Sequence, residues 1–324
     1  MTILAQAANA SPPADSFASV DALVQGLAGV GYIASRRIAT ALYMSVHLQK
    51  PILVEGVAGV GKTELALSTA ALLDLPLIRM QCYEGLDESK ALYEWKYGKQ
   101  LLYTQLLKTQ LAEVMDGAQG LRESVERLHS FDDVFFSKEF LEPRPLLQAI
   151  DSEQSVVLLV DEIDKADFEF ESLLLEVLSD FQVSIPELGT LKGRSKPLVF
   201  LTSNDTRDLS DALKRRCLHL HIDFPTTQLE GRIVRARVPQ ITQAMTDHLV
   251  EFVSRVREMD LKKLPSVSET IDWAKSLVLL HADSLDEDLV RSSLNALLKY
   301  EDDLTSVVDN LSGLLSQEQK VTDA

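Results

Sequence analysis

The chain has 324 residues, enough for about two domains, and its 32 Lys and Arg against 49 Asp and Glu give a formal net charge of −17. Such an acidic excess disfavours a general nucleic-acid surface or docking on anionic lipid, and two isolated cysteines exclude a disulfide scaffold or a Cys-rich zinc site. Hydrophobic residues make up 46% of the chain, so we expect a soluble, globular protein of the cytoplasm.

The chain begins with a stretch rich in Ala, Ser and Pro, and we expect residues 1–16 to form a flexible tail. The part before the small-residue run at 8–10 carries no Lys or Arg and has a short apolar stretch, which disfavours a signal peptide. No segment approaches the roughly 18 consecutive apolar residues of a membrane-spanning helix, so we expect no membrane insertion.

Short, continuous apolar runs alternate with stretches of helical spacing up to residue 225. Such runs are typical of parallel strands covered on both faces, so the pattern predicts an α/β fold with a five-stranded parallel sheet between helices. Beyond that point apolar residues recur at helical spacing, which predicts a core domain over 17–226 and a small all-α domain over 227–324. The predicted strands are 51–55, 76–80, 155–160, 197–201 and 217–222.

A glycine-rich loop follows the first predicted strand and leads into a predicted helix. It fits the pattern GxxxxGK[ST], in which glycines let backbone N–H groups face phosphate oxygens and the helix N-terminus adds partial positive charge. We expect Lys62 to reach the β- and γ-phosphates of a nucleotide and Thr63 to ligate Mg²⁺. The expected nucleotide-binding residues of this loop are Gly56, Val57, Ala58, Gly59, Val60, Gly61, Lys62, Thr63 and Glu64.

The third predicted strand ends in an acidic pair, Asp161 and Glu162. We expect Asp161 to hold the Mg²⁺ shell and Glu162 to polarise the water that attacks the γ-phosphate. In isolation such a pair is more typical of a helix N-cap followed by a solvated turn. Downstream of a P-loop, the position of Glu162 favours hydrolysis over nucleotide binding alone and disfavours a small-molecule kinase.

Two further polar features follow the acidic pair. The fourth predicted strand leads to Asn204, which is placed to hydrogen-bond the γ-phosphate or the attacking water; the alternative is a residue that starts a turn. Arg215 and Arg216 end a short predicted helix before the fifth strand. They either complement the dipole of that helix or include an arginine finger that reaches the nucleotide of a neighbouring subunit.

The order of P-loop, Asp-Glu, Ser-Asn, Arg-Arg and helical domain resembles that of AAA+ ATPases. Over about residues 20–310 the chain is similar in particular to the MoxR family, and within it to the CoxD-type ATPases of carbon monoxide dehydrogenase maturation. The segments that carry this closer similarity are QCYEGLD (81–87), LYEWKY (92–97), RPLLQA (144–149), RC (216–217) and ETIDW (269–273).

The resemblance implies an AAA+ P-loop core followed by a lid domain, with ATP and Mg²⁺ as ligands. It implies that Tyr32 and Ile33 lie in the turn that contacts adenine. It also implies a helix-2 insertion at about 84–141 and a hairpin before sensor 1 at about 182–196, with ordinary surface loops as the alternative. The remaining implied assignments are Walker A at 56–63, Walker B at Asp161 and Glu162, sensor 1 at Asn204, and the arginine finger at Arg216 with Arg215 as the alternative.

One position departs from the family pattern. The lid helix of the family often begins with an arginine that touches the γ-phosphate, and Glu269 stands at that position here. Ser266 and Glu269 have the spacing of a capping box, so we expect Glu269 to cap the helix. Sensing of ATP by the lid would then depend on another basic residue or be weak.

The resemblance implies an ATP-hydrolysing chaperone that remodels a client metalloenzyme so that its metal centre can be inserted. A trans-acting Arg216 requires a homo-oligomeric ring, expected to be a hexamer, and the usual partner in the family is a protein with a von Willebrand A domain. One alternative is a nucleotide-switched binding module with little turnover. Another is an activase of a different enzyme, of the nitric oxide reductase or carbon-fixation type.

Overall fold

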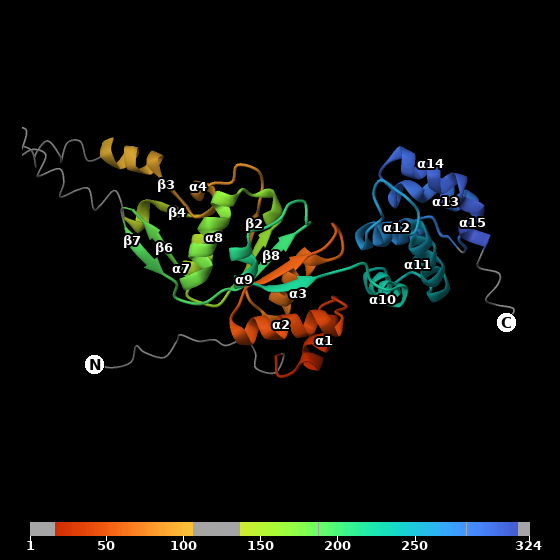
Figure 1. Ribbon diagram of the computed structural model, residues 1–324, viewed down its shortest axis with the longest axis horizontal. Coiled ribbons are helices and arrows are strands. Elements are labelled where there is room, and N and C mark those ends of the chain that lie inside the picture. The colour runs from red at the N-terminus through yellow and green to blue at the C-terminus, as the bar shows by residue number, and fades with distance from the viewer. Residues whose placement is uncertain (1–16, 106–136, 187, 283, 317–324) are drawn as a thin grey trace, which may run out of the picture.

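The computed structural model describes residues 17–105, 137–186, 188–282 and 284–316 (Figure 1). The predicted tail at 1–16 and a large part of the predicted insertion, at 106–136, lie outside the described residues. Across the described residues, no helix combines the length and apolar character that crossing a membrane requires.

A five-stranded parallel sheet forms the centre of the first part of the chain, as predicted. Its order is β2-β5-β8-β1-β9, so the strand that precedes the glycine-rich loop lies between β8 and β9. Because the strands are parallel, the polar segments that follow β1, β2, β5 and β8 all emerge at the carboxyl ends of the strands, on one side of the sheet. The strands are β1 (Ile52–Glu55), β2 (Leu77–Gln81), β5 (Val157–Asp161), β8 (Leu198–Ser203) and β9 (Leu218–His221).

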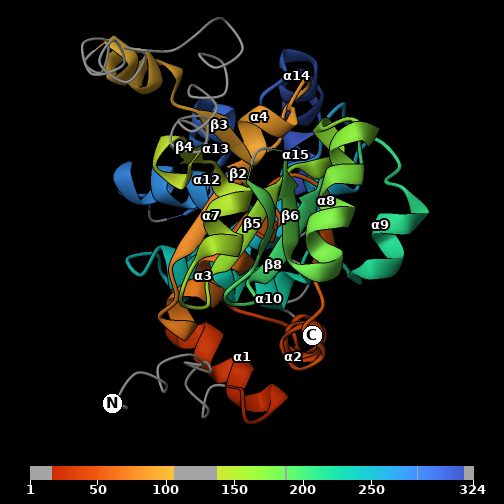
Figure 2. The ribbon, with the colours of Figure 1, turned by 90° about the vertical axis from the view of Figure 1, so that its left-hand side faces the viewer.

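Alternating side chains along these strands divide the core into two layers. Leu53 and Leu201 pack with one set of helices, whereas Ile52 and Phe200 pack with the other. Burying each such side chain stabilises the fold by about 1.5–3 kcal/mol. The first layer contains α7 (Pro145–Asp151), α8 (Phe168–Asp180) and α9 (Asp211–Arg216), and the second contains α1 (Val20–Gly29), α2 (Arg36–Leu48) and α3 (Lys62–Leu73) (Figure 2).

Two small antiparallel sheets accompany the main sheet. One pairs β3 (Tyr93–Trp95) with β4 (Leu141–Pro143), and α4 (Glu88–Ala91) precedes it. The other pairs β6 (Gln182–Ile185) with β7 (Gly189–Lys192), within the segment where the hairpin before sensor 1 is expected.

The chain after Phe224 is helical, as predicted, and it buries its own apolar cluster between Val234 and Leu311. Trp273 is fully buried in this cluster, and its indole N–H donates to the Ser293 hydroxyl at 2.9 Å. Figure 1 shows these helices as a group beside the sheet-containing part of the molecule. They are α10 (Thr227–Arg237), α11 (Gln243–Arg257), α12 (Val267–Leu279), α13 (Glu287–Ser293), α14 (Glu301–Asp309) and α15 (Leu311–Ser316).

Candidate functional site

The loop between β1 and α3 has a backbone that requires glycine at several positions. Gly56 has a φ of 147°, and a Cβ there would lie 2.2 Å from the carbonyl oxygen of Ile222. Gly61 has a φ of 98° and stands at the N-cap of α3, where no side chain caps the first N–H groups of the helix. The free N–H groups and the helix dipole make this loop a ready site for phosphate.

Lys62 is buried at the start of α3, with 6% of its surface exposed. Its ammonium group donates to the carbonyl oxygens of Gly56 at 2.6 Å and Val57 at 2.8 Å, and to Asn204 Oδ1 at 2.8 Å. Burial lowers the pKa of Lys62, and the acidic side chains of Asp164, Asp161 and Glu162 at the end of β5 and just after it oppose this effect. A cation held inside the loop is suited to bind phosphate oxygens.

Asp161 is the last residue of β5, and its side chain is 4% exposed. Its carboxylate accepts hydrogen bonds from the hydroxyl groups of Thr63 at 3.0 Å and Thr202 at 2.5 Å, and it forms an ion pair with Arg79 at 2.6 Å. The hydroxyl and carboxylate oxygens of Thr63 and Asp161 are the hard donors that Mg²⁺ prefers, so this pair fits the metal by its chemistry.

Glu162 follows with a φ of 58°, a left-handed conformation that is uncommon for a residue other than glycine. Its Oε1 accepts from the Asn204 amide at 3.1 Å, and its Oε2 accepts from Gln81 at 2.8 Å and Lys165 at 2.5 Å. The three donors fix the direction of a carboxylate that a hydrolase would use as general base.

Asn204 links the cation and the base, because its Oδ1 accepts from Lys62 while its Nδ2 donates to Glu162. Asp164 fixes this residue from behind by accepting from the Asn204 backbone N–H at 3.2 Å. Burial acts to raise the pKa of Asp164, but hydrogen bonds from Thr206 and from backbone N–H groups hold that pKa below its ordinary value.

The structure thus brings together the predicted residues of the loop, the acidic pair and Asn204, and it adds residues that sequence reasoning missed. The missed residues lie near the carboxyl ends of strands or just beyond them, except Arg79, which is in the middle of β2 and reaches that end with its side chain. Gln81 was predicted only as part of a segment of family similarity, and its place at the site follows from the register, which pairs it with the last residue of β5. The other missed residues are Arg79, Thr202, Asp164 and Lys165.

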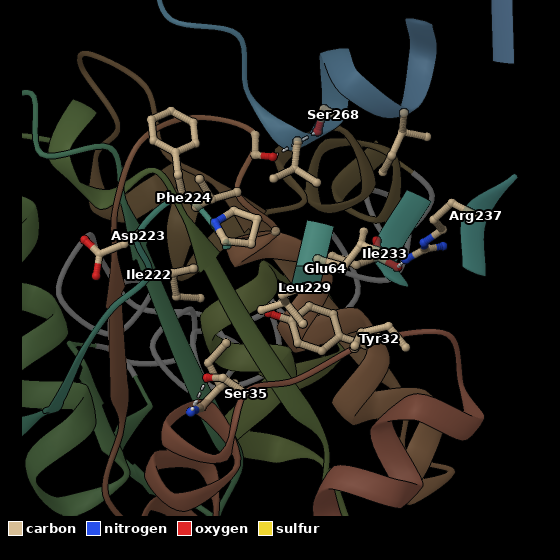
Figure 3. Close-up of a pocket in the computed structure, with 18 of the residues that line it drawn as sticks. Tyr32, Ser35, Glu64, Ile222, Asp223, Phe224, Leu229, Ile233, Arg237 and Ser268 are labelled. Atoms are coloured by element: carbon tan, nitrogen blue, oxygen red, sulfur yellow. Dashed lines mark hydrogen bonds and ion pairs between the residues drawn. The ribbon is translucent and has the colours of Figure 1, made fainter. Parts of the chain in front are cut away.

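A cavity of about 590 Å³ opens beside the loop (Figure 3). Tyr32 and Ile33 line it from the turn before α2, and Ile233 lines it from α10. Burial, together with the charge of Glu64, raises the pKa of the Tyr32 hydroxyl. An ion pair between Glu64 and Arg237 joins α3 to α10 across this cavity. The predicted adenine-turn residues therefore face a space formed by the sheet-containing part and the C-terminal helices.

The start of α12 touches the glycine-rich loop directly. The backbone N–H and the hydroxyl of Ser268 both donate to the Gly59 carbonyl oxygen, at 3.3 Å and 3.2 Å. Ser266 and Glu269 form the predicted capping box, with the Ser266 N–H donating to the carboxylate at 3.0 Å. Burial acts to raise the pKa of Glu269, but hydrogen bonds from Ser266 and Lys263 hold that pKa below its ordinary value.

Arg215 and Arg216 lie away from this constellation. They end α9, just before β9, whose first residue Leu218 pairs with Ile52 at the amino end of β1. The glycine-rich loop follows the opposite end of that strand. Arg216 donates from Nε to the Ser179 hydroxyl at 2.8 Å, and both arginines line a separate hollow of about 630 Å³.

Comparison with known proteins gives matches over the sheet-containing part and beyond it. A family model described as "AAA domain (dynein-related subfamily)" matches residues 51–217. An uncharacterised protein of Staphylococcus haemolyticus is 25% identical over 238 residues, covering 71% of this chain and 75% of that protein. The gas vesicle ATPase GvpN of Haloferax mediterranei is 25% identical over 238 residues, covering 68% of this chain and 60% of GvpN. The solved structure of the Thermotoga maritima RuvB Holliday junction branch migration motor has 16% identity and a TM-score of 0.46, covering 91% of this chain and 78% of that one.

Proposed function

The chain belongs to the dynein-related subfamily of AAA domains, and from this premise we propose that it hydrolyses ATP with Mg²⁺ to remodel another protein. One observation carries the proposal: Asn204 joins Lys62 to Glu162, beside the hydrogen bond between Thr63 and Asp161. A phosphate-binding cation, a candidate base and a candidate pair of metal ligands thereby share one edge of the sheet.

The cavity next to the loop supports binding of a nucleoside triphosphate. Its volume of about 590 Å³ has room for a purine base and ribose, and Tyr32 and Ile33 give it an apolar wall. Gly59 and Gly61 also line it, so a base held there would have its phosphates close to the N-terminus of α3.

Each polar residue then has a defined task. Lys62 would exchange its carbonyl and amide partners for phosphate oxygens, and Asn204 would keep Glu162 directed at the attacking water. Glu162 would accept a proton from that water as it attacks the γ-phosphate. Bound Mg²⁺ would supply positive charge to the β- and γ-phosphates, with Thr63 and Asp161 as its protein ligands.

We further propose that catalysis is completed between subunits of a homo-oligomeric ring, expected to be a hexamer. Arg216, with Arg215 as the alternative, ends α9 at the far end of the β1–β9 pair from the loop, which suits contact with the nucleotide of a neighbouring copy. By its resemblance to MoxR ATPases, and to the CoxD type among them, the ring would act in the cytoplasm on a client metalloenzyme, with a von Willebrand A domain protein as partner. One relative, GvpN, is by its name an ATPase of gas vesicles and not of a metalloenzyme.

A nucleotide-switched binding module is the second candidate. The observation that favours it is the direct contact of Ser268 with Gly59, together with the use of Glu269 as a helix cap where an arginine could sense phosphate. In that case binding of ATP would move α12 relative to the loop, and turnover would be negligible.

Turnover of ATP by the full chain tests these proposals. Glu162→Gln should lower kcat by about 10²–10⁴-fold, whereas the matched surface variant Glu142→Gln should hydrolyse like the wild type. Lys62→Ala should abolish nucleotide binding. Arg216→Ala should bind nucleotide normally but lose turnover at concentrations where a ring forms. A Glu162→Gln variant with full activity would contradict the assigned base, and negligible turnover of the wild type with tight binding would favour the switch.

A further inference from the structure

Arg79 is the unexpected cation of the candidate site. It lies on β2, an edge strand of the sheet, and its side chain runs along the strand to place a guanidinium nitrogen 2.6 Å from Asp161 Oδ2. The Arg79 side chain is 50% exposed and the Asp161 side chain is 4% exposed. Among the described residues, Arg79 is the one cation that forms an ion pair with Asp161.

The two oxygens of the Asp161 carboxylate have different partners. Oδ1 accepts from Thr202 at 2.5 Å and from Thr63 at 3.0 Å, whereas Oδ2 holds Arg79 at 2.6 Å and is 3.3 Å from the Thr63 hydroxyl. A magnesium ion needs a carboxylate oxygen at about 2.0–2.1 Å in a crowded octahedral shell. A guanidinium at hydrogen-bond distance from the same carboxylate would repel that ion, so the two cations compete for Asp161.

We propose that Arg79 is a resident counter-ion of Asp161, which Mg²⁺ displaces when Mg²⁺–ATP binds. The inference rests on the proposed ATPase function. Arg79 is a positioning residue in this scheme, because it acts through Asp161 and Gln81 rather than on the reacting atoms.

Displacement of Arg79 also has a path to the base. The same guanidinium nitrogen of Arg79 donates to Gln81 Oε1 at 3.2 Å, and the Gln81 amide donates to Glu162 at 2.8 Å. Half of the Arg79 side chain is exposed on an edge strand, so the guanidinium can leave toward solvent without disturbing the core. Arrival of the metal would therefore free Gln81 as well as Asp161, and Gln81 holds the Glu162 carboxylate.

The test compares nucleotide affinity with and without the metal. Full-length wild type, Arg79→Gln and Arg79→Lys are titrated with a fluorescent, non-hydrolysable ATP analogue, once in saturating Mg²⁺ and once in EDTA. Arg194→Gln is the matched control, because the Arg194 side chain is 51% exposed, close to the value for Arg79, and it pairs with Glu153 and Asp151 and not with a residue of the candidate site. Arg79→Gln should bind the Mg²⁺ form about fivefold more tightly than the wild type, the factor expected from one partly exposed ion pair, and should bind equally in EDTA.

The remaining variants make the result decisive. Arg79→Lys keeps a positive charge and should bind the Mg²⁺ form as the wild type does; a Lys variant as tight as the Gln variant would contradict the competition of charges. Equal or weaker binding of the Mg²⁺ form by Arg79→Gln would overturn the assignment, provided that the wild type and Arg194→Gln bind normally. If those two proteins bind the analogue under neither condition, the proposed function itself falls. Thermal unfolding without nucleotide gives a second readout: Arg79→Gln should unfold at a lower temperature than Arg194→Gln, since it leaves a buried carboxylate unpaired.

Discussion

Replacing Gly59 by alanine tests the contact between the glycine-rich loop and α12. Gly59 has a φ of 80°, and a Cβ there would lie 2.1 Å from Ser266 Oγ and 2.7 Å from Ser266 Cβ. The serine cannot turn away freely, because its N–H donates to the Glu269 carboxylate and its hydroxyl belongs to the same capping box. The methyl group must therefore displace the start of α12 or distort the loop.

The magnitude follows from two contributions. A left-handed conformation costs a residue with a Cβ about 1–2 kcal/mol, and overpacking against a fixed neighbour adds about 1–3 kcal/mol. Gly189→Ala separates them, because Gly189 has a φ of 76° and a methyl group added there would meet no heavy atom within 4 Å. We expect Gly189→Ala to lose about 1–2 kcal/mol and Gly59→Ala about 2–5 kcal/mol.

The assay is thermal unfolding together with binding of a fluorescent ATP analogue. A Ser266→Gly change removes the two nearest atoms that the new methyl group meets and leaves Ser268 Oγ at 3.3 Å. Compared with Ser266→Gly alone, which loses the capping box, the double variant Gly59→Ala/Ser266→Gly should therefore recover most of the steric part of the loss and leave the strain. Binding should follow the same order, weakest in Gly59→Ala and partly restored in the double variant. Equal stability of Gly59→Ala and Gly189→Ala, or no recovery in the double variant, would refute the reasoning.

Three further results are expected from buried groups. Arg257→Met should destabilise the protein by about 3–5 kcal/mol, because Glu230, 1% exposed, would lose its bidentate partner; an unchanged unfolding temperature would contradict this. Asp164 has a pKa below its ordinary 3.8 despite burial, so its contribution to stability should be complete above about pH 4 and be lost as the pH falls further. In Asp164→Asn the unfolding temperature should therefore fall less between about pH 4 and lower pH than it does in the wild type. Burial raises the pKa of the Cys82 and Cys217 thiols to about 12, so labelling by a thiol reagent at neutral pH should require unfolding, and rapid labelling of the native protein would count against it.

The sequence predicts the sheet well because strands buried on both faces are continuous apolar runs. Val157–Asp161, for example, is buried throughout, and the two faces of the sheet are covered by helices as that pattern requires. The roles of the loop at 56–63 and of the acidic pair could also be predicted from the sequence, since their chemistry depends on residues that are neighbours in the chain. Ser266 and Glu269 belong to the same class, because a capping box is a local pattern.

The remaining contacts depend on register and reach, which no local pattern encodes. Arg79 meets Asp161 because β2 lies beside β5 in this register and because a long side chain runs two residues along its strand. The contact of Ser268 with Gly59 depends on how the C-terminal helices pack on the core. The role of Arg216 depends on a second copy of the chain, so it stays a prediction.

The charge balance of the site argues that nucleotide binding is an exchange of partners. Lys62 already donates hydrogen bonds to the loop carbonyls and to Asn204, and Arg79 already pairs with Asp161. A ligand gains affinity only by the difference between new and existing partners, because the protein groups are paired before it arrives. Phosphate without metal would release Lys62 and leave Arg79 on Asp161, whereas phosphate with Mg²⁺ would replace both sets of contacts. Asn204 contacts Glu162 directly, and Arg79 contacts it through Gln81, so each exchange of partners would change the hydrogen bonds of Glu162 separately. Both changes together would require a ligand that carries phosphate and metal.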